Sequence, residues 1–452
     1  MRNNFYKILV SAALLATLSC NKELNTVPTQ SIDQAAALNT SSDVLVALTG
    51  CYADLGGSRF YGGYPFVASE LLANNGELNW SGTFQQFTQM NNKAIPVDNS
   101  FVYDTWSTGY IVINDVNNVL SALAVVDSSK RDQVEGEAKF IRASAYFDLV
   151  RLYAKSYNDG DPAANDGVPI VLTPTRAITA ASKVKRNKVS EVYAQVLSDL
   201  TAAETKIPAK NSFYATKVSA SGMLARVYLQ MGDYANAAAA ANRAITTGLA
   251  NGLALKTAFA DAFPSASTTA SANTTEDIFA MQVTPSSGAN SFQTFFSSTG
   301  RGDIQIKPAH TALYEAGDAR LAFFYTSGGS LFTGKNSYLY SNVHILRLAE
   351  MYLTRAEANF RAGAAVGDTP LNDINVIRLR AKLTPLTAPQ LDLAAILKER
   401  HLELAFEGHA IHDIKRTQGS VGAIPWNSPK LIYPIPSLDR TANSNLSQND
   451  GY

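Results

Sequence analysis

Three glutamates near the C-terminal end have the spacing that most suggests chemistry. Glu399, Glu403 and Glu407 recur every four residues in a predicted helix over 396–407. Side chains at that spacing stand in one column, where like charges repel by roughly a few tenths of a kcal/mol per pair. The column is therefore either a buried electrostatic joint with cations opposite it or a pair of carboxylates for glycoside hydrolysis, which requires an open cleft.

The positive charges of neighbouring predicted helices favour the electrostatic joint. Four arginines on these helices are ready counter-ions for the glutamates: Arg347, Arg355, Arg378 and Arg380. Counter-ions at close range would close the space that a sugar chain needs. We therefore predict that the column is structural and that the protein is not an enzyme.

A second cluster follows immediately, in which His409 and His412 precede Asp413. Two histidines three residues apart on a helix can share a metal ion. Third and fourth ligands are not evident in the sequence, and a metal needs them. We expect structural hydrogen bonds from His409 and Asp413 and a packing role for His412, and we predict no metal and no cofactor.

The N-terminus has the order of a bacterial export signal. Arg2 and Lys7 precede an apolar run over 8–18 that is too short to span a bilayer. The run ends in Leu-Ser-Cys at 18–20, which resembles a lipobox. This pattern predicts a signal peptide at 1–19, an acylated Cys20 and a polar tether over 20–42; the alternative is a plain secretory signal with an incidental cysteine.

Composition narrows the class of ligand. Lys+Arg and Asp+Glu are both 38, and a neutral chain lacks the concentrated basic surface typical of nucleic-acid binders. The 20 tyrosines, 20 phenylalanines and 3 tryptophans suit uncharged polar ligands. Apart from Cys20 the only cysteine is Cys51, so no intramolecular disulfide is expected in the exported protein.

Apolar periodicity predicts a mainly α protein. The predicted helices are 44–55, 66–72, 99–126, 133–153, 189–206, 219–231, 235–247, 345–363, 370–382 and 396–407. The pair 219–231 and 235–247, joined by Gly232 and Asp233, has the small and aromatic residues of a tetratricopeptide hairpin. We predict one domain over 43–452, a tetratricopeptide-like helical-repeat scaffold with less regular segments at about 56–105 and 250–343, the second a long loop-rich insertion.

Several separate motifs resemble the SusD/RagB family. They are GEAKFIRASAYFDLVRLY (136–153), ILRLAEMYLTRAEA (345–358), LNDINVIRLRA (371–381), ILKERHLELAFEGHAIHDIKR (396–416) and LIYPIPSLDRTANSNLSQNDGY (431–452). The chain departs from the family pattern after His409, where Ala410, Ile411 and His412 stand in place of the usual arginine and aromatic residues. The resemblance extends over nearly the whole chain and is weakest at 56–105 and 250–343.

The resemblance implies a function as well as a fold. Members of this family are lipoproteins of the outer membrane that face the exterior, capping a SusC-like TonB-dependent transporter. They capture nutrients without catalysis, usually oligosaccharides and sometimes peptides. We therefore expect this protein to capture oligosaccharides. One alternative is that it captures peptides. The other is that it is a glycoside hydrolase, which agrees less well with the predicted counter-ions of the glutamates.

Family ligands sit on loops from the two irregular segments, opposite the repeats. Sugars stack on aromatic rings while amides and arginine hold their hydroxyls, and polar groups beside apolar surface suit a small ligand. Trp106 lies in a helical stripe and is expected in the core. By composition and position, the candidate ligand-binding residues are Tyr61, Tyr64, Asn75, Trp80, Phe84, Phe292, Phe296 and Arg301.

Overall fold

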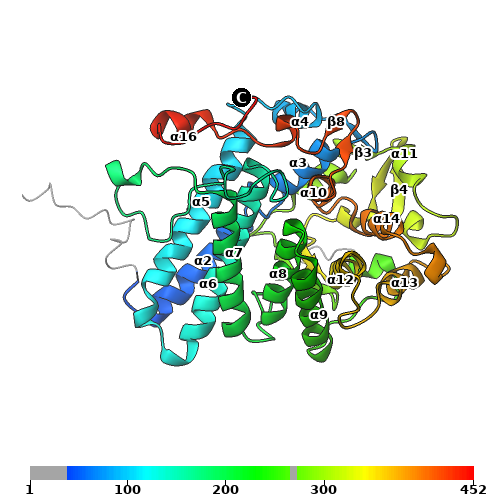
Figure 1. The fold of residues 1–452 in the computed structure, drawn as a ribbon, viewed down its shortest axis with the longest axis horizontal. Helices are drawn as coiled ribbons and strands as arrows, with labels where there is room; N and C mark the ends of the chain where they lie inside the picture. Colours follow the sequence, from blue (N-terminus) through cyan, green and yellow to red (C-terminus); the bar gives the residue numbers. More distant parts are fainter. Residues whose placement is uncertain (1–37, 265–271) are drawn as a thin grey trace, which may run out of the picture.

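The computed structural model describes residues 38–264 and 272–452 (Figure 1). The predicted signal peptide, the acylated Cys20 and nearly all of the tether lie outside the described residues. Within those residues, no helix combines the length and apolar character needed to cross a membrane.

Helices stacked side by side form the scaffold, in which successive helices from α2 to α13 pack on one another and α14 packs mainly on α12 (Figure 1). In stacking order they are α2 (Ser41–Leu55), α5 (Ser100–Ser121), α6 (Ser128–Tyr153), α7 (Val189–Lys206), α8 (Lys217–Met231), α9 (Tyr234–Ala250), α12 (Leu348–Ala362), α13 (Pro370–Arg380) and α14 (Leu393–Leu404). This confirms the predicted helical-repeat architecture.

The α8–α9 hairpin shows how local sequence sets one repeat. Gly232 ends α8 with a φ of 76°, a conformation that glycine adopts without steric cost, and the Asp233 side chain caps α9. Ala237 and Ala241 are fully buried. Small side chains let the two helices approach closely, as the tetratricopeptide pattern predicts.

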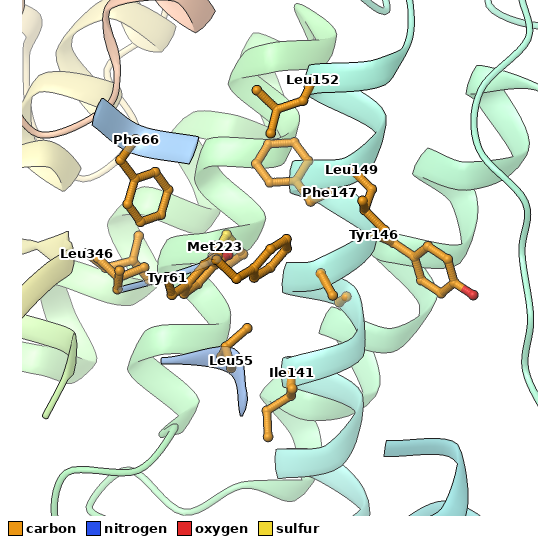
Figure 2. Close-up of a cluster of buried hydrophobic side chains, with 14 of the residues drawn as sticks. Leu55, Tyr61, Phe66, Ile141, Tyr146, Phe147, Leu149, Leu152, Met223 and Leu346 are labelled. Carbon is orange, nitrogen blue, oxygen red and sulfur yellow. The ribbon is translucent and has the colours of Figure 1, made fainter. Parts of the chain in front are cut away.

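Helix α6 lies at the centre of the hydrophobic core. Its second half is buried almost all round, because α5 and α7 flank it and the segment after α2 covers it. Figure 2 shows Ile141 and Phe147 of this helix beside Tyr61 and Met223. Trp106 of α5 is 3% exposed and makes an edge contact with Tyr153, which confirms its predicted place in the core.

Short strands join parts of the chain that are far apart in sequence. Strands β1 (Leu78–Trp80), β3 (Ile304–Ile306), β5 (Ser330–Thr333) and β4 (Phe324–Ser327) form one antiparallel sheet in that order. Strand β2 (Asp277–Met281) pairs with β6 (Val343–Arg347), and β7 (Ser420–Val421) pairs with β8 (Ile424–Pro425). The first sheet brings the two irregular segments together.

Six short helices complete the described fold. They are α3 (Tyr64–Ala73), α4 (Gln85–Asn91), α10 (Ser291–Phe296), α11 (Pro308–Thr311), α15 (Ala410–Arg416) and α16 (Ser437–Ala442). Helices α3 and α4 and the C-terminal segment with α16 lie along one edge of the molecule, at the top of Figure 1.

The structure corrects two predicted helices. The helix predicted over 345–363 begins at Leu348, because 343–347 pair with β2 as the buried strand β6, and tertiary pairing overrides the local helical pattern. The helix predicted over 396–407 runs from Leu393 to Leu404. At the end of this helix, Nζ of Lys335 donates hydrogen bonds to the backbone carbonyl oxygens of Glu403 and Ala405, at 2.8 and 2.9 Å.

Candidate functional site

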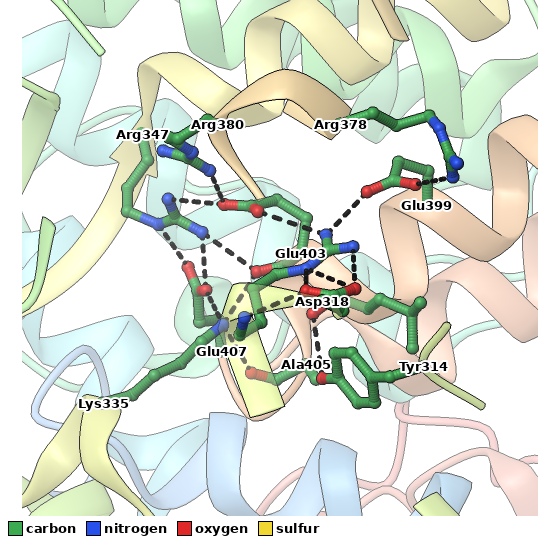
Figure 3. Close-up of polar contacts among 12 residues, drawn as sticks. Tyr314, Asp318, Lys335, Arg347, Arg378, Arg380, Glu399, Glu403, Ala405 and Glu407 are labelled. Carbon is green, nitrogen blue, oxygen red and sulfur yellow. Dashed lines mark hydrogen bonds and ion pairs between the residues drawn. The ribbon is translucent and has the colours of Figure 1, made fainter. Parts of the chain in front are cut away.

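The glutamates lie in a buried ion-pair network (Figure 3). Glu403 is 0% exposed and pairs with Arg380, with Arg347 at 3.2 Å and with Arg320 at 3.5 Å. Burial alone raises the pKa of Glu403, but these arginines outweigh it and hold the pKa at about 2. The carboxylate is therefore ionised and enclosed.

The other two glutamates are held in the same way. Glu399 lies 2.7 Å from Arg320 and 3.3 Å from Arg378. Glu407 lies beyond the end of α14, so it is not part of a helical column, and it pairs with Arg347 at 2.7 Å and with Lys335. None of the three presents a free carboxylate to an open cleft, and a pair of catalytic carboxylates is not formed here.

Sequence reasoning found only part of this network. Arg347, Arg378 and Arg380 are counter-ions as predicted, but Arg355 instead pairs with Asp373 at 2.6 Å. Arg320 and Lys335 were missed, because both come from the loop-rich insertion, whose sequence has no periodicity that could place them.

The histidine pair at 409 and 412 does not meet Asp413 as a metal site. The Asp413 carboxylate accepts hydrogen bonds from Nε of Arg400 at 2.9 Å and Nε of Arg416 at 2.7 Å. His412 is 4% exposed, as a packing residue would be. Burial, and then nearby arginines, hold the pKa values of both histidines well below their usual range.

Asn75 is separated from the aromatic candidates. Its Oδ1 accepts the backbone N–H of Gly422 at 3.0 Å, and it lines a cavity of about 290 Å³ beside α14. Glu70, Glu77, Arg400 and His401 also line this cavity. Burial raises the pKa of Glu70 to about 7, although the Gly408 N–H donates to its carboxylate at 2.7 Å.

Three predicted binding residues come together at the surface. Tyr64, Trp80 and Phe84 are half-buried and pack around the buried ring of Phe295, at centroid distances of 6.1, 6.4 and 5.8 Å respectively. Phe295 belongs to the second irregular segment, while the other rings belong to the first. The pairing of β1 with β3 thus builds a mixed surface from both segments.

Arg301 lies over this group of rings. Its guanidinium carbon is 4.8 Å from the centroid of Phe84, and it donates hydrogen bonds to Asp303 at 2.7 Å and Thr83 at 3.1 Å. A cation over a ring is attracted to the negative ring face. We call Tyr64, Trp80, Phe84 and Arg301 the aromatic surface.

Three other candidate residues are core residues in this structure. Tyr61 is 1% exposed and stacks on Phe60 at 5.3 Å, and its hydroxyl donates to the Ser144 carbonyl at 3.4 Å. Phe292 and Phe296 are 3% and 0% exposed. Their side chains are closed off from a ligand, which corrects the placement of all three in a loop surface.

One polar constellation carried no sequence signal. Oε2 of Glu77 lies 2.5 Å from Nδ1 of His310 and 2.9 Å from Nε2 of His401. Glu77 precedes β1, His310 lies in α11 and His401 lies in α14, so more than two hundred residues separate Glu77 from the two histidines. No spacing rule could have found them.

Comparison with known proteins agrees with this fold and these motifs. Residues 43–229 match the family described as "Starch-binding associating with outer membrane", and residues 326–430 match the SusD family. SusD-like protein P2 of Formosa agariphila is 26% identical over 99% of each chain. Starch-binding protein SusD of Bacteroides thetaiotaomicron is 34% identical over 26% of this chain and 22% of its own length.

A solved structure extends the likeness to the whole fold. The crystal structure of a putative sugar binding protein from Bacteroides vulgatus superposes with a TM-score of 0.83 and 26% identity, and the match covers 92% of this chain and 99% of that one. Solved SusD superfamily structures from Bacteroides vulgatus and Bacteroides thetaiotaomicron, which are 22% and 23% identical, share this helical fold with TM-scores of 0.81 and 0.80. The chain belongs to the SusD/RagB family.

Proposed function

We propose that this protein is a non-catalytic lipoprotein of the outer membrane that captures oligosaccharides at the cell surface and passes them to a SusC-like TonB-dependent transporter. Acylated Cys20 anchors it in the outer-membrane lipid, facing the exterior. The observation that carries the proposal is the aromatic surface, which the two irregular segments build jointly. The family description and the names of the relatives, starch-binding and putative sugar binding, support the carbohydrate class.

The chemistry of the aromatic surface suits a sugar chain. Tyr64, Trp80 and Phe84 offer ring faces and edges for C–H groups, and Arg301 offers donors for hydroxyls or ring oxygens. The exposed Asn79 side chain lies on the adjoining strand β1 and donates to the half-buried Gln305 of β3 at 2.6 Å, which places amide groups beside the aromatic surface. Convergent polar groups beside apolar surface are what a neutral polar ligand needs.

A peptide is the alternative ligand, because aromatic rings with an arginine and amides also bind peptide groups. A glycoside hydrolase is disfavoured by the glutamate network, in which arginines and a lysine occupy the carboxylates.

The further candidate residue Asn75 lies on the cavity beside α14, and we keep it as a candidate for a ligand that extends toward that cavity.

Binding of the purified protein to a panel of glycans and peptides tests the proposal. We expect at least one oligosaccharide to bind, and we expect replacement of Trp80 by Ala to weaken its binding by more than about 1 kcal/mol, as truncation of an important aromatic contact residue does at an interface. Calorimetry measures both affinities. Because Trp80 also contacts Phe87 and Phe295, circular dichroism must show that the variant is folded.

Phe213 provides the matched control. It is an aromatic residue with 45% of its surface exposed, outside the aromatic surface. Replacing Phe213 by Ala should leave the affinity unchanged. Binding of peptides alone would move the proposal to the peptide class, and an oligosaccharide that binds equally well to both variants would exclude the aromatic surface as its site.

A further inference from the structure

We propose that Glu77, His310 and His401 form a binding site for a divalent transition-metal ion of the zinc type, with one coordination position open to the cavity beside α14. This goes beyond the proposed function and departs from the expectation of no metal drawn from the sequence. The ligand atoms of the three side chains all lie within 4.8 Å of one another. Two imidazoles and one carboxylate are a donor set that zinc uses when its fourth position is open.

The distances between the Glu77 oxygen and the two imidazole nitrogens are slightly shorter than those between the ligands of a bound zinc ion. The Glu77 oxygen is 2.5 Å from His310 and 2.9 Å from His401, which is hydrogen-bond contact. Ligands of a tetrahedral zinc ion, bound at about 2.0–2.1 Å, stand about 3.3 Å apart. The Glu77 oxygen therefore needs to move away from each of the two imidazole nitrogens by less than about 1 Å for the ion to bind between them. The half-exposed His401 side chain, 39% exposed, has room for this.

His310 is already oriented as a ligand. Its side chain is fully buried, and Nδ1 faces Glu77 while Nε2 lies 3.1 Å from the Tyr314 hydroxyl. The Tyr314 hydroxyl in turn lies 3.3 Å from the Leu402 carbonyl, so the imidazole is fixed through its second nitrogen. Metal-ligating histidines are normally held in this way, because the partner sets the ring orientation and the tautomer.

The cavity supplies the open position. Glu77 and His401 both line it, and its volume of about 290 Å³ holds water and a small ligand. The carboxyl group of Glu70 also lies on the cavity wall. Arg400, which also lines the cavity, pairs with Asp413 at 2.9 Å, and this carboxylate offsets part of its positive charge.

A bound ion would connect three separate parts of the chain. Glu77 leads directly into β1, His310 belongs to the loop-rich insertion, and His401 belongs to the scaffold helix α14. Trp80 of the aromatic surface lies three residues after Glu77. The metal would thus fix the strand that carries Trp80 against the scaffold.

Metal titration of the purified full chain tests the site. The protein is freed of metal with a chelator and titrated with zinc alone by calorimetry, and bound zinc is counted by elemental analysis. We expect one zinc ion per chain and a melting temperature that rises with zinc. Replacing Glu77 by Gln or His401 by Gln should each weaken zinc binding by at least about tenfold and reduce the thermal shift, because each removes a ligand.

His344 offers a matched control. Its Nδ1 lies 2.5 Å from Asp277, so it forms the same kind of histidine–carboxylate pair, but it does not belong to the three-residue cluster. His344→Gln should keep zinc binding. If that variant does not fold, the wild-type protein and the two ligand variants still decide the result. The proposal is overturned if the wild type binds no zinc, or if both ligand variants bind zinc as tightly as the wild type does.

Discussion

Glu403 is surrounded by guanidinium groups from parts of the chain that are distant in sequence. Arg320 comes from the loop-rich insertion, Arg347 from β6 and Arg380 from α13. A buried ion pair often adds little net stability compared with apolar packing, but removal of one partner leaves uncompensated buried charge. Glu403 is therefore a structural residue: the intact ion pairs add little net stability, but loss of the carboxylate would destabilise the fold strongly.

Replacing Glu403 by Gln should destabilise the protein by about 3–5 kcal/mol, because the surrounding arginines lose their carboxylate. Urea denaturation at pH 7 measures the free energy of unfolding. Ligand binding at a temperature where the variant is folded should be unchanged. Loss of an activity on sugars in this variant would contradict the structural role.

The pH dependence separates this effect from general damage. The pKa of Glu403 is about 2 in the folded protein against an ordinary value of 4.5. A lowered pKa stabilises the fold above the unfolded value, and this stability is lost as pH falls through the folded pKa. The difference between wild type and variant should therefore be constant from pH 7 down to about pH 5 and shrink as the pH falls below 4.5 toward about 2. The surface variant Asp132→Asn, in an exposed pair with Lys206, should change stability by less than about 1 kcal/mol throughout.

At the scale of elements, the turn between α14 and α15 connects the glutamate network to the cavity. Phe406 and Gly408 both have positive φ, 64° and 84°, so two residues in the turn adopt left-handed backbone. The Gly408 N–H donates to Glu70, and an added Cβ at Gly408 would lie 2.6 Å from Cβ of Phe66 in α3. The turn is thus packed against α3 as closely as a glycine allows.

Gly408→Ala should be clearly destabilising, because it adds left-handed strain and a clash with Phe66. Gly363 ends α12 with a φ of 60°, and nothing lies within 4 Å of an added Cβ. Gly363→Ala therefore isolates the strain, about 1–2 kcal/mol. We expect Gly408→Ala to cost at least about 1 kcal/mol more in urea denaturation, the low end of overpacking costs. Equal costs would mean that the turn can move away from α3.

At the scale of the whole molecule, the helical stack is a support on which the two irregular segments meet. Strands β1 and β3 hold Trp80 and Phe84 near Arg301, while α14 and its arginine partners lock the last helices beneath the insertion. In the proposed function, a lipid anchor and a polar leader attach this body to the membrane. The anchor can then be tested separately from ligand binding.

Cys20→Ala should move the protein from the membrane fraction to the soluble fraction, because it removes the residue that carries the acyl chains. Fractionation followed by immunoblotting measures this. Cys51→Ala is the matched control, since Cys51 is 1% exposed in the core and should leave the protein with the membranes. Retention of Cys20→Ala in the membranes would contradict the anchor.

Pull-down of the wild type from outer membranes should recover a TonB-dependent barrel, and its absence would count against the transporter partner.

Local sequence determined much of this protein. Periodic apolar residues, the Gly232 turn and the family motifs predicted the helical stack and the family, because helices and hairpins depend on neighbours in sequence. Val189–Lys206 was predicted to the residue. Three of the four arginines that were expected to pair with the glutamates do so, Arg347, Arg378 and Arg380, although Arg347 lies in a strand and not in a helix.

Only tertiary structure decided which side chains reach the surface. Tyr61 and Tyr64 lie three residues apart in the same aromatic stretch, yet one is buried under α6 and the other lies on the aromatic surface. Helix α14 ends at Leu404, where Lys335 from the loop-rich insertion binds its terminal carbonyls, and strand pairing replaces the predicted start of α12. Glu77, His310 and His401 meet only after folding. In each case long-range packing and charge compensation, which local sequence does not encode, determined the result.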